Sequence, residues 1–247
     1  MITSLSVGIW DYLLIVVASI HGTAIAYLPS PRVKAWLLCL PTTFSVSFLA
    51  LGQPLGISNI LSLVLLLLFT NGVRVLHIRW NVAIIPAIVI CALGYCVAGS
   101  LLIPLLPSGA GMFWAACVLV FLLAVVMLRF QPSREECGHR SPLPVMVKFP
   151  IIVVVIVLLI MIKGWLQGFM TLFPMVGVVG AYEARSCLWT ISRQIPIFMI
   201  LFLPMLITMY LTQSSLGPMG GLISGWGVFI IGLLMYSFFN KLVTKGS

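Results

Sequence analysis

The residues able to do chemistry are few, and one acid stands out among them. Glu183 follows an apolar stretch, with Arg185 and Arg193 shortly after it. An opposite charge nearby favours the ionised form of a carboxylate, so we expect Glu183 to form an ion pair with these arginines. Such a pair fits either a gate in a transport path or an interfacial ion pair that fixes the geometry of a loop.

Two prolines interrupt apolar stretches. Pro41 is followed by the hydroxyl residues Thr42, Thr43 and Ser45, and Pro174 lies in a second stretch. A proline inside a helix removes a backbone hydrogen bond and frees a carbonyl group. Broken helices at equivalent places in two halves of a chain are typical of transporter sites. The alternative is a packing kink whose hydroxyls bond back to the preceding turn.

A third group, Asn71, Arg74 and His77, follows a spacing of three residues and shares one helix face. Arg74 could hold an anionic headgroup or substrate, or it could be an ordinary interface anchor. His21 lies inside an apolar stretch. There we expect a neutral histidine bonded to a neighbouring helix, with a proton relay as the alternative.

Known catalytic motifs are missing from the sequence. It contains no HExxH, no GxSxG and no Gly-rich phosphate loop. The six cysteines form no CxxC pair, and His21, His77 and His139 lie on separate segments. We therefore expect no enzyme, no metal site and no cofactor.

Composition shows which elements must position these residues. Of 247 residues, 62% are hydrophobic and 7% charged, against about 25% charged in a soluble domain. Apolar stretches of about 20 residues recur, each long enough to cross a bilayer. Only helices or a closed barrel satisfy the backbone in lipid, and continuous apolar runs favour helices. The sequence predicts an all-α, polytopic transmembrane helical bundle.

The distribution of basic residues predicts the topology. With the N-terminus outside and the C-terminus in the cytoplasm, twelve of the 13 Lys and Arg residues fall on the cytoplasmic side, Lys163 being the exception. The net charge of +9 is then a topology signal of an inner-membrane protein and predicts no nucleic-acid partner. Loop 131–144 is expected in the cytoplasm. The nine predicted spans are 9–28, 35–52, 57–76, 82–105, 111–129, 146–162, 165–182, 194–212 and 220–240.

A weak internal repeat suggests how the spans are organised. Lys34-Ala-Trp36 precedes the stretch with Pro41, and Lys163-Gly-Trp165 precedes the stretch with Pro174. These stretches run in opposite directions, which predicts an inverted repeat of four-helix units, although chance similarity stays open. The predicted division is a first unit (1–106), a connector helix and cytoplasmic loop (107–144) and a second unit (145–247).

The second unit resembles the GlpM-like proteins, a family of small four-span bacterial membrane proteins. The resemblance is clearest in residues 160–240, and Leu40 to Phe44 resembles the same element in the first unit. It implies a four-helix architecture, here duplicated, and no defined activity. It is carried by Leu172-Phe173-Pro174, Tyr182 to Arg185, Arg193, Ile195-Pro196 and Trp226.

These observations favour a small secondary transporter or flippase for a polar or anionic substrate, lipid-like substrates included. The scarcity of acids argues against a cation carrier, which needs carboxylates in the membrane. The alternative is a non-catalytic membrane subunit or assembly factor. Membrane lipids are the expected partners, and other membrane subunits or a homodimer are left open. A cavity reaching Thr42, Thr43 and Pro174 would favour transport, and a solid core would favour the subunit.

Overall fold

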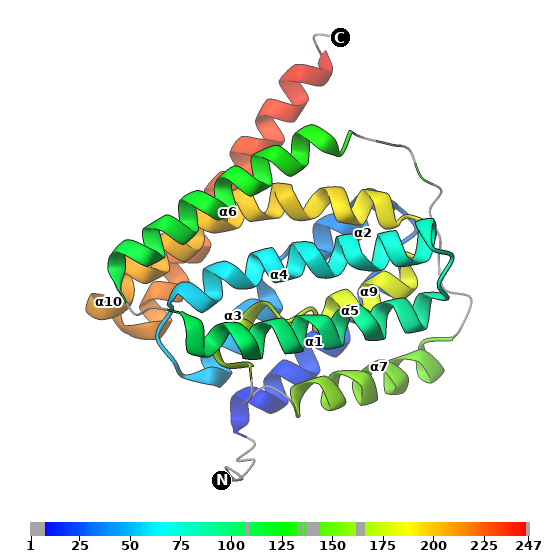
Figure 1. Ribbon diagram of the computed structural model, residues 1–247, viewed down its shortest axis with the longest axis horizontal. Coiled ribbons are helices and arrows are strands. Elements are labelled where there is room, and N and C mark those ends of the chain that lie inside the picture. The colour runs from blue at the N-terminus through cyan, green and yellow to red at the C-terminus, as the bar shows by residue number, and fades with distance from the viewer. Residues whose placement is uncertain are drawn as a thin grey trace.

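The computed structural model is a bundle of helices that run side by side (Figure 1). It describes residues 8–106, 109–132, 134, 136, 144–161 and 166–245, without the side chains of Gln167 and 239–245. Over these residues there is helix and no strand, so the all-α prediction is confirmed. Most of loop 131–144 and the Lys163–Trp165 turn lie outside the described residues.

The helices follow one another with short connections. In chain order the first are α1 (Ile9–Tyr27), α2 (Pro31–Leu38), α3 (Thr42–Leu51), α4 (Ile57–Arg74), the π-helical turn η1 (Val75–Arg79) and α5 (Ile84–Leu102). The rest are η2 (Ile103–Leu105), α6 (Ala110–Phe130), α7 (Val145–Ile160), the 3-10 helix η3 (Gln167–Leu172), α9 (Met175–Glu183) and α10 (Leu188–Lys245).

Proline and glycine explain the main boundaries. Helix α1 ends before Pro29, because a proline disfavours helical backbone in the residue that precedes it. Pro31 occupies the first turn of α2, where its missing N–H costs nothing. Gly52 ends α3 with a positive φ of 61°, the left-handed conformation that suits glycine at a helix C-terminus.

Helix α10 consists of two helices that meet at Gly217 and fold back on each other. Gly217 has a φ of 70° and a ψ of 177°, outside helical values. Beyond it, the Ser224 hydroxyl lies 3.1 Å from the Thr212 hydroxyl. The backbone of Gly225 lies against Met205. The two parts of α10 therefore form an antiparallel hairpin, seen as the orange turn in Figure 1.

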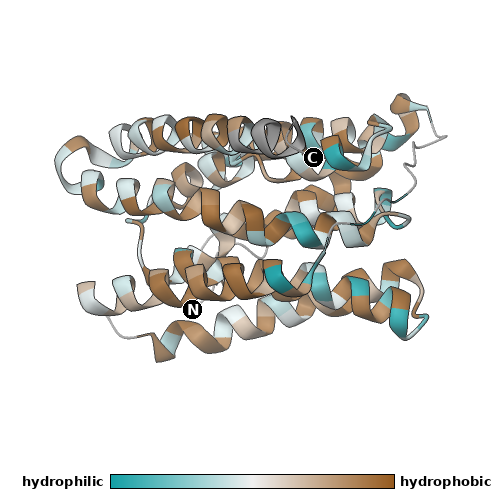
Figure 2. Ribbon diagram, turned by 90° about the horizontal axis from the view of Figure 1, so that it is seen from above, coloured by the Kyte–Doolittle hydropathy of each residue, from teal (hydrophilic) through white to brown (hydrophobic). Residues whose placement is uncertain are grey.

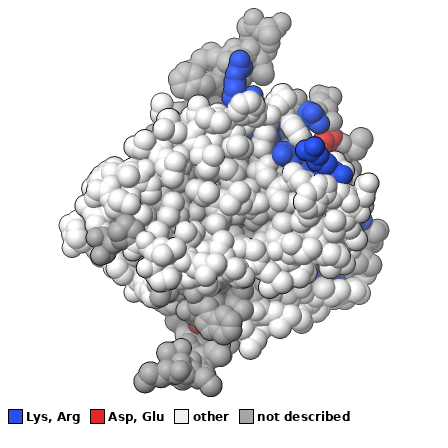
Figure 3. Space-filling model, viewed as in Figure 1, with Lys and Arg blue, Asp and Glu red and all other residues white. Residues whose placement is uncertain are grey.

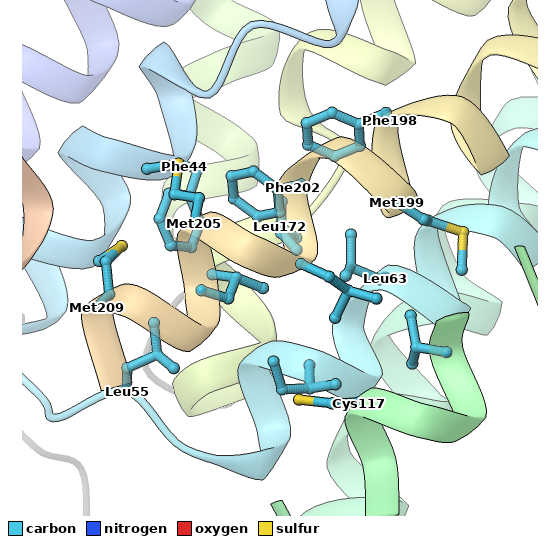
Figure 4. Packing of buried hydrophobic residues seen from close by; sticks show 14 of the residues in the cluster. Phe44, Leu55, Leu63, Cys117, Leu172, Phe198, Met199, Phe202, Met205 and Met209 are labelled. Atoms are coloured by element: carbon cyan, nitrogen blue, oxygen red, sulfur yellow. The ribbon is translucent and has the colours of Figure 1, made fainter. Parts of the chain in front are cut away.

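Two large apolar clusters and one small one form the interior of the described residues, and α4 belongs to both large clusters. Ile60 and Leu63 of α4 pack with α3, α6 and α10, where aromatic and Met side chains such as Phe202 interdigitate (Figure 4). Phe69 and Val73 of the same helix pack with α1, α5, α7 and α9. Because α4 is buried on both faces, it is the central helix of the bundle.

Six helical segments of the described residues are long and apolar enough to cross a membrane. They are Ile9–Tyr27, Pro31–Leu51, Ile57–Arg79, Ile84–Leu105, Ala110–Phe130 and the 51-residue segment Leu188–Phe238. Two shorter apolar helices, Val145–Ile160 and Gly168–Glu183, lie where the sequence predicted the sixth and seventh spans. Hydrophobic residues cover the helices along most of their length, with hydrophilic residues gathered toward one end (Figure 2).

The α10 hairpin supplies a stability test. A Cβ atom on Gly225 would lie 2.7 Å from Cγ of Met209 and 3.2 Å from the carbonyl oxygen of Met205. Gly225→Ala should therefore lower the free energy of unfolding by about 1–3 kcal/mol, the usual cost of overpacking. Unfolding of purified protein in detergent, followed by circular dichroism, measures it.

Gly227→Ala is the matched control, because no atom lies within 4 Å of a Cβ placed there. That change should be neutral or stabilise by up to about 1 kcal/mol through helix propensity. Equal effects of the two substitutions would contradict the close packing of the hairpin.

Candidate functional site

Two helices that are each broken at a proline lie side by side in the bundle. The first consists of α2 and α3 and is interrupted before Pro41; the second consists of η3 and α9 and is interrupted at Phe173 and Pro174. Helix α2 contacts α9, and α3 contacts η3, so the two broken helices run antiparallel. Each proline directly precedes the second piece of its own helix.

A cavity of about 70 Å³ lies between the two breaks. This is room for about two water molecules, since a water occupies about 30 Å³ in the liquid. Pro41 and Pro174 both line it, and so does Thr43, whereas Thr42 does not. The other hydroxyl residues of its wall are Thr70, Thr171 and Ser192.

His21 spans the break in the first helix. Its Nε2 lies 2.7 Å from the carbonyl oxygen of Leu37, whose usual helical partner is missing because Pro41 has no N–H. Its Nδ1 lies 3.0 Å from the hydroxyl of Thr42. A carbonyl can only accept, so Nε2 carries a proton. The predicted bond from His21 to a neighbouring helix is confirmed, and its neutral state stays a prediction.

Other side chains hold the 3-10 helix that precedes the second break. The amide nitrogen of Asn59 donates to the carbonyl oxygen of Gly168 (3.2 Å) and to the hydroxyl of Thr171 (3.0 Å). The hydroxyl of Tyr95 donates to the carbonyl oxygen of Phe169 (2.8 Å). These groups come from α4 and α5, so the irregular backbone of η3 is held by neighbouring helices.

Ser45 has a structural role. Its hydroxyl donates to the carbonyl oxygen of Pro41 (2.6 Å), the back-bonding that is common for hydroxyls in membrane helices. The hydroxyl oxygen of Ser45 in turn accepts a hydrogen bond from Nε1 of Trp226 (2.8 Å). Thr43 is thus the one member of the predicted Thr42, Thr43 and Ser45 group that lines the cavity.

Glu183 is buried and pairs with a residue other than those predicted. Its carboxylate lies 2.7 Å from Nζ of Lys148, with side-chain exposures of 2% and 8%. Nζ of Lys34, also buried, donates to the backbone carbonyl of Glu183 (3.1 Å). We call Lys34, Lys148 and Glu183 the inner cluster.

The predicted pairing of Glu183 with Arg185 and Arg193 is therefore wrong. Nη1 of Arg185 donates to the carbonyl oxygen of Tyr182, and Nε of Arg193 donates to that of Gln131. Glu183 points into the bundle, where α7 packs on α9 and brings Lys148 to it. The arginines follow in the turn and in α10, which take their side chains away.

The predicted Asn71, Arg74 and His77 face separates into different contacts. Asn71 accepts a hydrogen bond from Gln131 (2.8 Å), and Nδ1 of His77 donates to the carbonyl of Val82 (2.9 Å). The guanidinium of Arg74 lies 4.5 Å from the ring centre of Trp189. Nη1 of Arg74 is buried, and no described residue accepts its hydrogen bond.

The loop before α7 is tied to the same region. Arg134 lies 3.8 Å from the ring centre of Trp189. The carboxylate of Glu136 accepts from the backbone N–H groups of Trp189 and Thr190, and so caps the start of α10. Asn71 thus bonds to the start of this loop, and Arg74 and Arg134 both lie against Trp189 of α10, so the two predicted roles of Arg74 stay open.

Basic residues gather at one end of the molecule. On the face in Figure 3, Lys and Arg side chains lie where α4 and α6 end and α10 begins. The inner cluster lies at this end as well, since α7 begins and α9 ends there. The uneven charge distribution expected from the sequence is therefore present in the fold.

Sequence reasoning missed five residues that make these contacts. Lys148 counted only as a topology signal, and Lys34 as a topology signal and part of the repeat, although a lysine just inside an apolar stretch is itself a sign of a buried partner. Asn59, Tyr95 and Trp189 carried no signal in the sequence, because their partners are distant backbone groups or side chains. Comparisons with family models, curated proteins and solved structures found no match to this chain.

The buried ion pair gives a test of the inner cluster. Glu183→Gln leaves the ammonium of Lys148 buried without its carboxylate, so we expect a loss of about 3–5 kcal/mol in the free energy of unfolding. Thermal unfolding in detergent measures it. The double variant Lys148→Met with Glu183→Gln should recover much of this loss.

Arg185→Gln is the control, because Arg185 is only partly buried and should change stability by less than about 1 kcal/mol. An unchanged melting temperature for Glu183→Gln would contradict the buried pair.

Proposed function

We propose that this protein is a small secondary transporter or flippase for a polar or anionic substrate. The observation that carries the proposal is the meeting of two half-helices at one cavity. Helices α3 and α9 both begin there, at Pro41 and Pro174. Discontinuous helices whose N-termini point at a central site are a recurring feature of secondary transporters.

The chemistry of the cavity favours an anion or an uncharged polar group. The N-terminal N–H groups of a helix carry partial positive charge and bind anions readily. Hydroxyl groups such as Thr43 and Ser192 supply further hydrogen bonds, and no described carboxylate lines the wall. A cation carrier would need such a carboxylate.

We further propose nine spans arranged as two inverted four-helix units, 1–106 and 145–247, joined by 107–144. Three pairs of equivalent elements support this repeat. Helix α1 packs on α7, the two broken helices pack on each other, and α4 packs on α10. The kink at Gly217 supplies the eighth and ninth spans from α10. The resemblance to the GlpM-like proteins stays a prediction.

The small size of the cavity favours the alternative hypothesis, a non-catalytic membrane subunit. A volume of about 70 Å³ cannot hold a lipid headgroup, so transport requires the broken helices to move apart. In α9, Gly177 lies against Phe69 of α4 and Gly180 lies against Leu38 of α2, and small residues allow helices to approach closely.

Transport is tested with purified protein in vesicles. Wild type should speed the movement of anionic fluorescent lipids or of small anions over protein-free vesicles. Thr43→Leu fills the cavity and should slow this movement at least about tenfold, the effect of roughly 1.4 kcal/mol. The matched control is Thr23→Leu in α1, which lies outside the cavity wall and should keep most of the activity.

Absence of any accelerated movement in wild type would contradict transport. Native purification tests the alternative. A membrane partner that co-purifies in a fixed ratio, and whose removal by mild washing lowers the folding stability, would favour the subunit hypothesis. Equal transport rates in wild type and Thr43→Leu would show that the cavity takes no part in transport.

The proposed orientation places the N-terminus outside and the C-terminus in the cytoplasm, in the inner membrane. It predicts that Gln53 faces outward and Arg79 inward, because they flank α4 at opposite ends. In a variant without native cysteines, an impermeant thiol reagent added to intact cells should label Gln53→Cys and spare Arg79→Cys. The reverse pattern would invert the topology.

A further inference from the structure

A second, larger cavity opens on the side of the bundle, away from the two breaks. It has a volume of about 560 Å³, in the range of ligand pockets. Helices α5 and α7 form its two walls, and α9 forms its floor. The helices are seen together in the lower part of Figure 1. We call this cavity the lateral groove.

The walls of the lateral groove are apolar and reach the lipid-facing surface. Val89 and Leu93 of α5 and Leu158 of α7 line it, and each is about half exposed. Deeper in, Phe173 and Val179 form part of the floor and are buried. In a bilayer the groove therefore opens to the hydrocarbon core, where its natural occupant is an acyl chain.

The length of the groove matches one leaflet. On α7 its lining runs from Lys148 to Leu159, about 16 Å at 1.5 Å per residue. On α5 it runs over an equal stretch from Ile85 to Cys96. Half of a hydrocarbon core is about 15 Å thick. The groove thus extends from the basic end of the bundle to about the middle of the membrane.

All polar groups of the lining except the thiol of Cys96 lie at one end. Lys148, Glu183 and Tyr182 stand where α7 begins and α9 ends. The guanidinium of Arg185 lies 5.1 Å from the ring centre of Tyr182, and Lys34 contacts the backbone of Glu183. Lys148 and Arg185 therefore stand at this end beside one described carboxylate, with the buried Lys34 behind them, and this excess of positive charge complements an anionic headgroup.

We propose that the lateral groove holds one anionic phospholipid of the leaflet at the basic end. Its acyl chain lies along α9 between α5 and α7, and its phosphate lies at Lys148 and Arg185. The polar end matches the phosphate, and the apolar length matches the chain. This lipid site is independent of transport: a protein that moves no substrate would still bind it.

Native mass spectrometry of the full-length protein tests the site, with phosphatidylglycerol added in steps in mild detergent. Wild type should retain one lipid at activation energies that strip the others. Val155→Trp fills the groove and should lower this retention at least about tenfold, because burial of several methylene groups is lost. Val154→Trp is the matched control: it is adjacent, 59% exposed and outside the lining, and should retain the lipid.

A second measurement needs no variant. Phosphatidylglycerol with a diazirine near the end of its acyl chain should cross-link wild type at residues around Cys96 and Leu159, the deep end of the groove. Cross-links spread evenly over lipid-facing helices would overturn the site. Loss of the lipid from both Trp variants would overturn it too, and equal retention of phosphatidylcholine would overturn the anionic headgroup.

Discussion

The need to satisfy backbone groups inside lipid governs this structure. A proline in a membrane helix removes the N–H that would bond to the carbonyl four residues earlier, and hydrocarbon offers no replacement. The chain meets this cost with side chains from other helices. His21 bonds to a backbone carbonyl at the break at Pro41, and Asn59 and Tyr95 bond to backbone carbonyls of the 3-10 helix before Pro174. Each break is thereby tied to the helix beside it, and the central cavity has walls held from several sides.

Charged groups at the basic end of the bundle are likewise satisfied by partners from other helices. A carboxylate or an ammonium alone in an apolar interior is costly, so Glu183 and Lys148 are buried as a pair. The pair joins α9 to α7, and the contact of Lys34 with the backbone of Glu183 joins α9 to α2. Three segments far apart in the sequence are thus fixed where the second broken helix ends. A movement of α9 would have to break these contacts or move α7 and α2 together with it.

The sequence was a good guide to what depends on local patterns. Apolar runs gave the helices, and Pro41 and Pro174 gave the two breaks, because both features act within a few residues. Glu183 stood out as an acid next to an apolar stretch for the same reason. Its predicted partners were wrong, because Arg185 is close in sequence whereas Lys148 is close in space. The lateral groove had no local signal. It arises from how α5 and α7 stand over α9, which only tertiary packing decides.

The two sides of the bundle differ in a way that explains where the groove lies. If the halves are related by the proposed inverted repeat, the end of α10 corresponds to α5. Aromatic side chains fill the space between that part of α10 and the first broken helix. Trp226 bonds to Ser45, and the ring centre of Tyr236 lies 5.3 Å from that of Trp36. Around α5 the corresponding space is lined by small and aliphatic residues such as Ala92 and Val155 and stays open. Aromatic packing therefore closes one side against the first broken helix, while the other side stays open beside the second broken helix, at the groove where we propose a bound lipid.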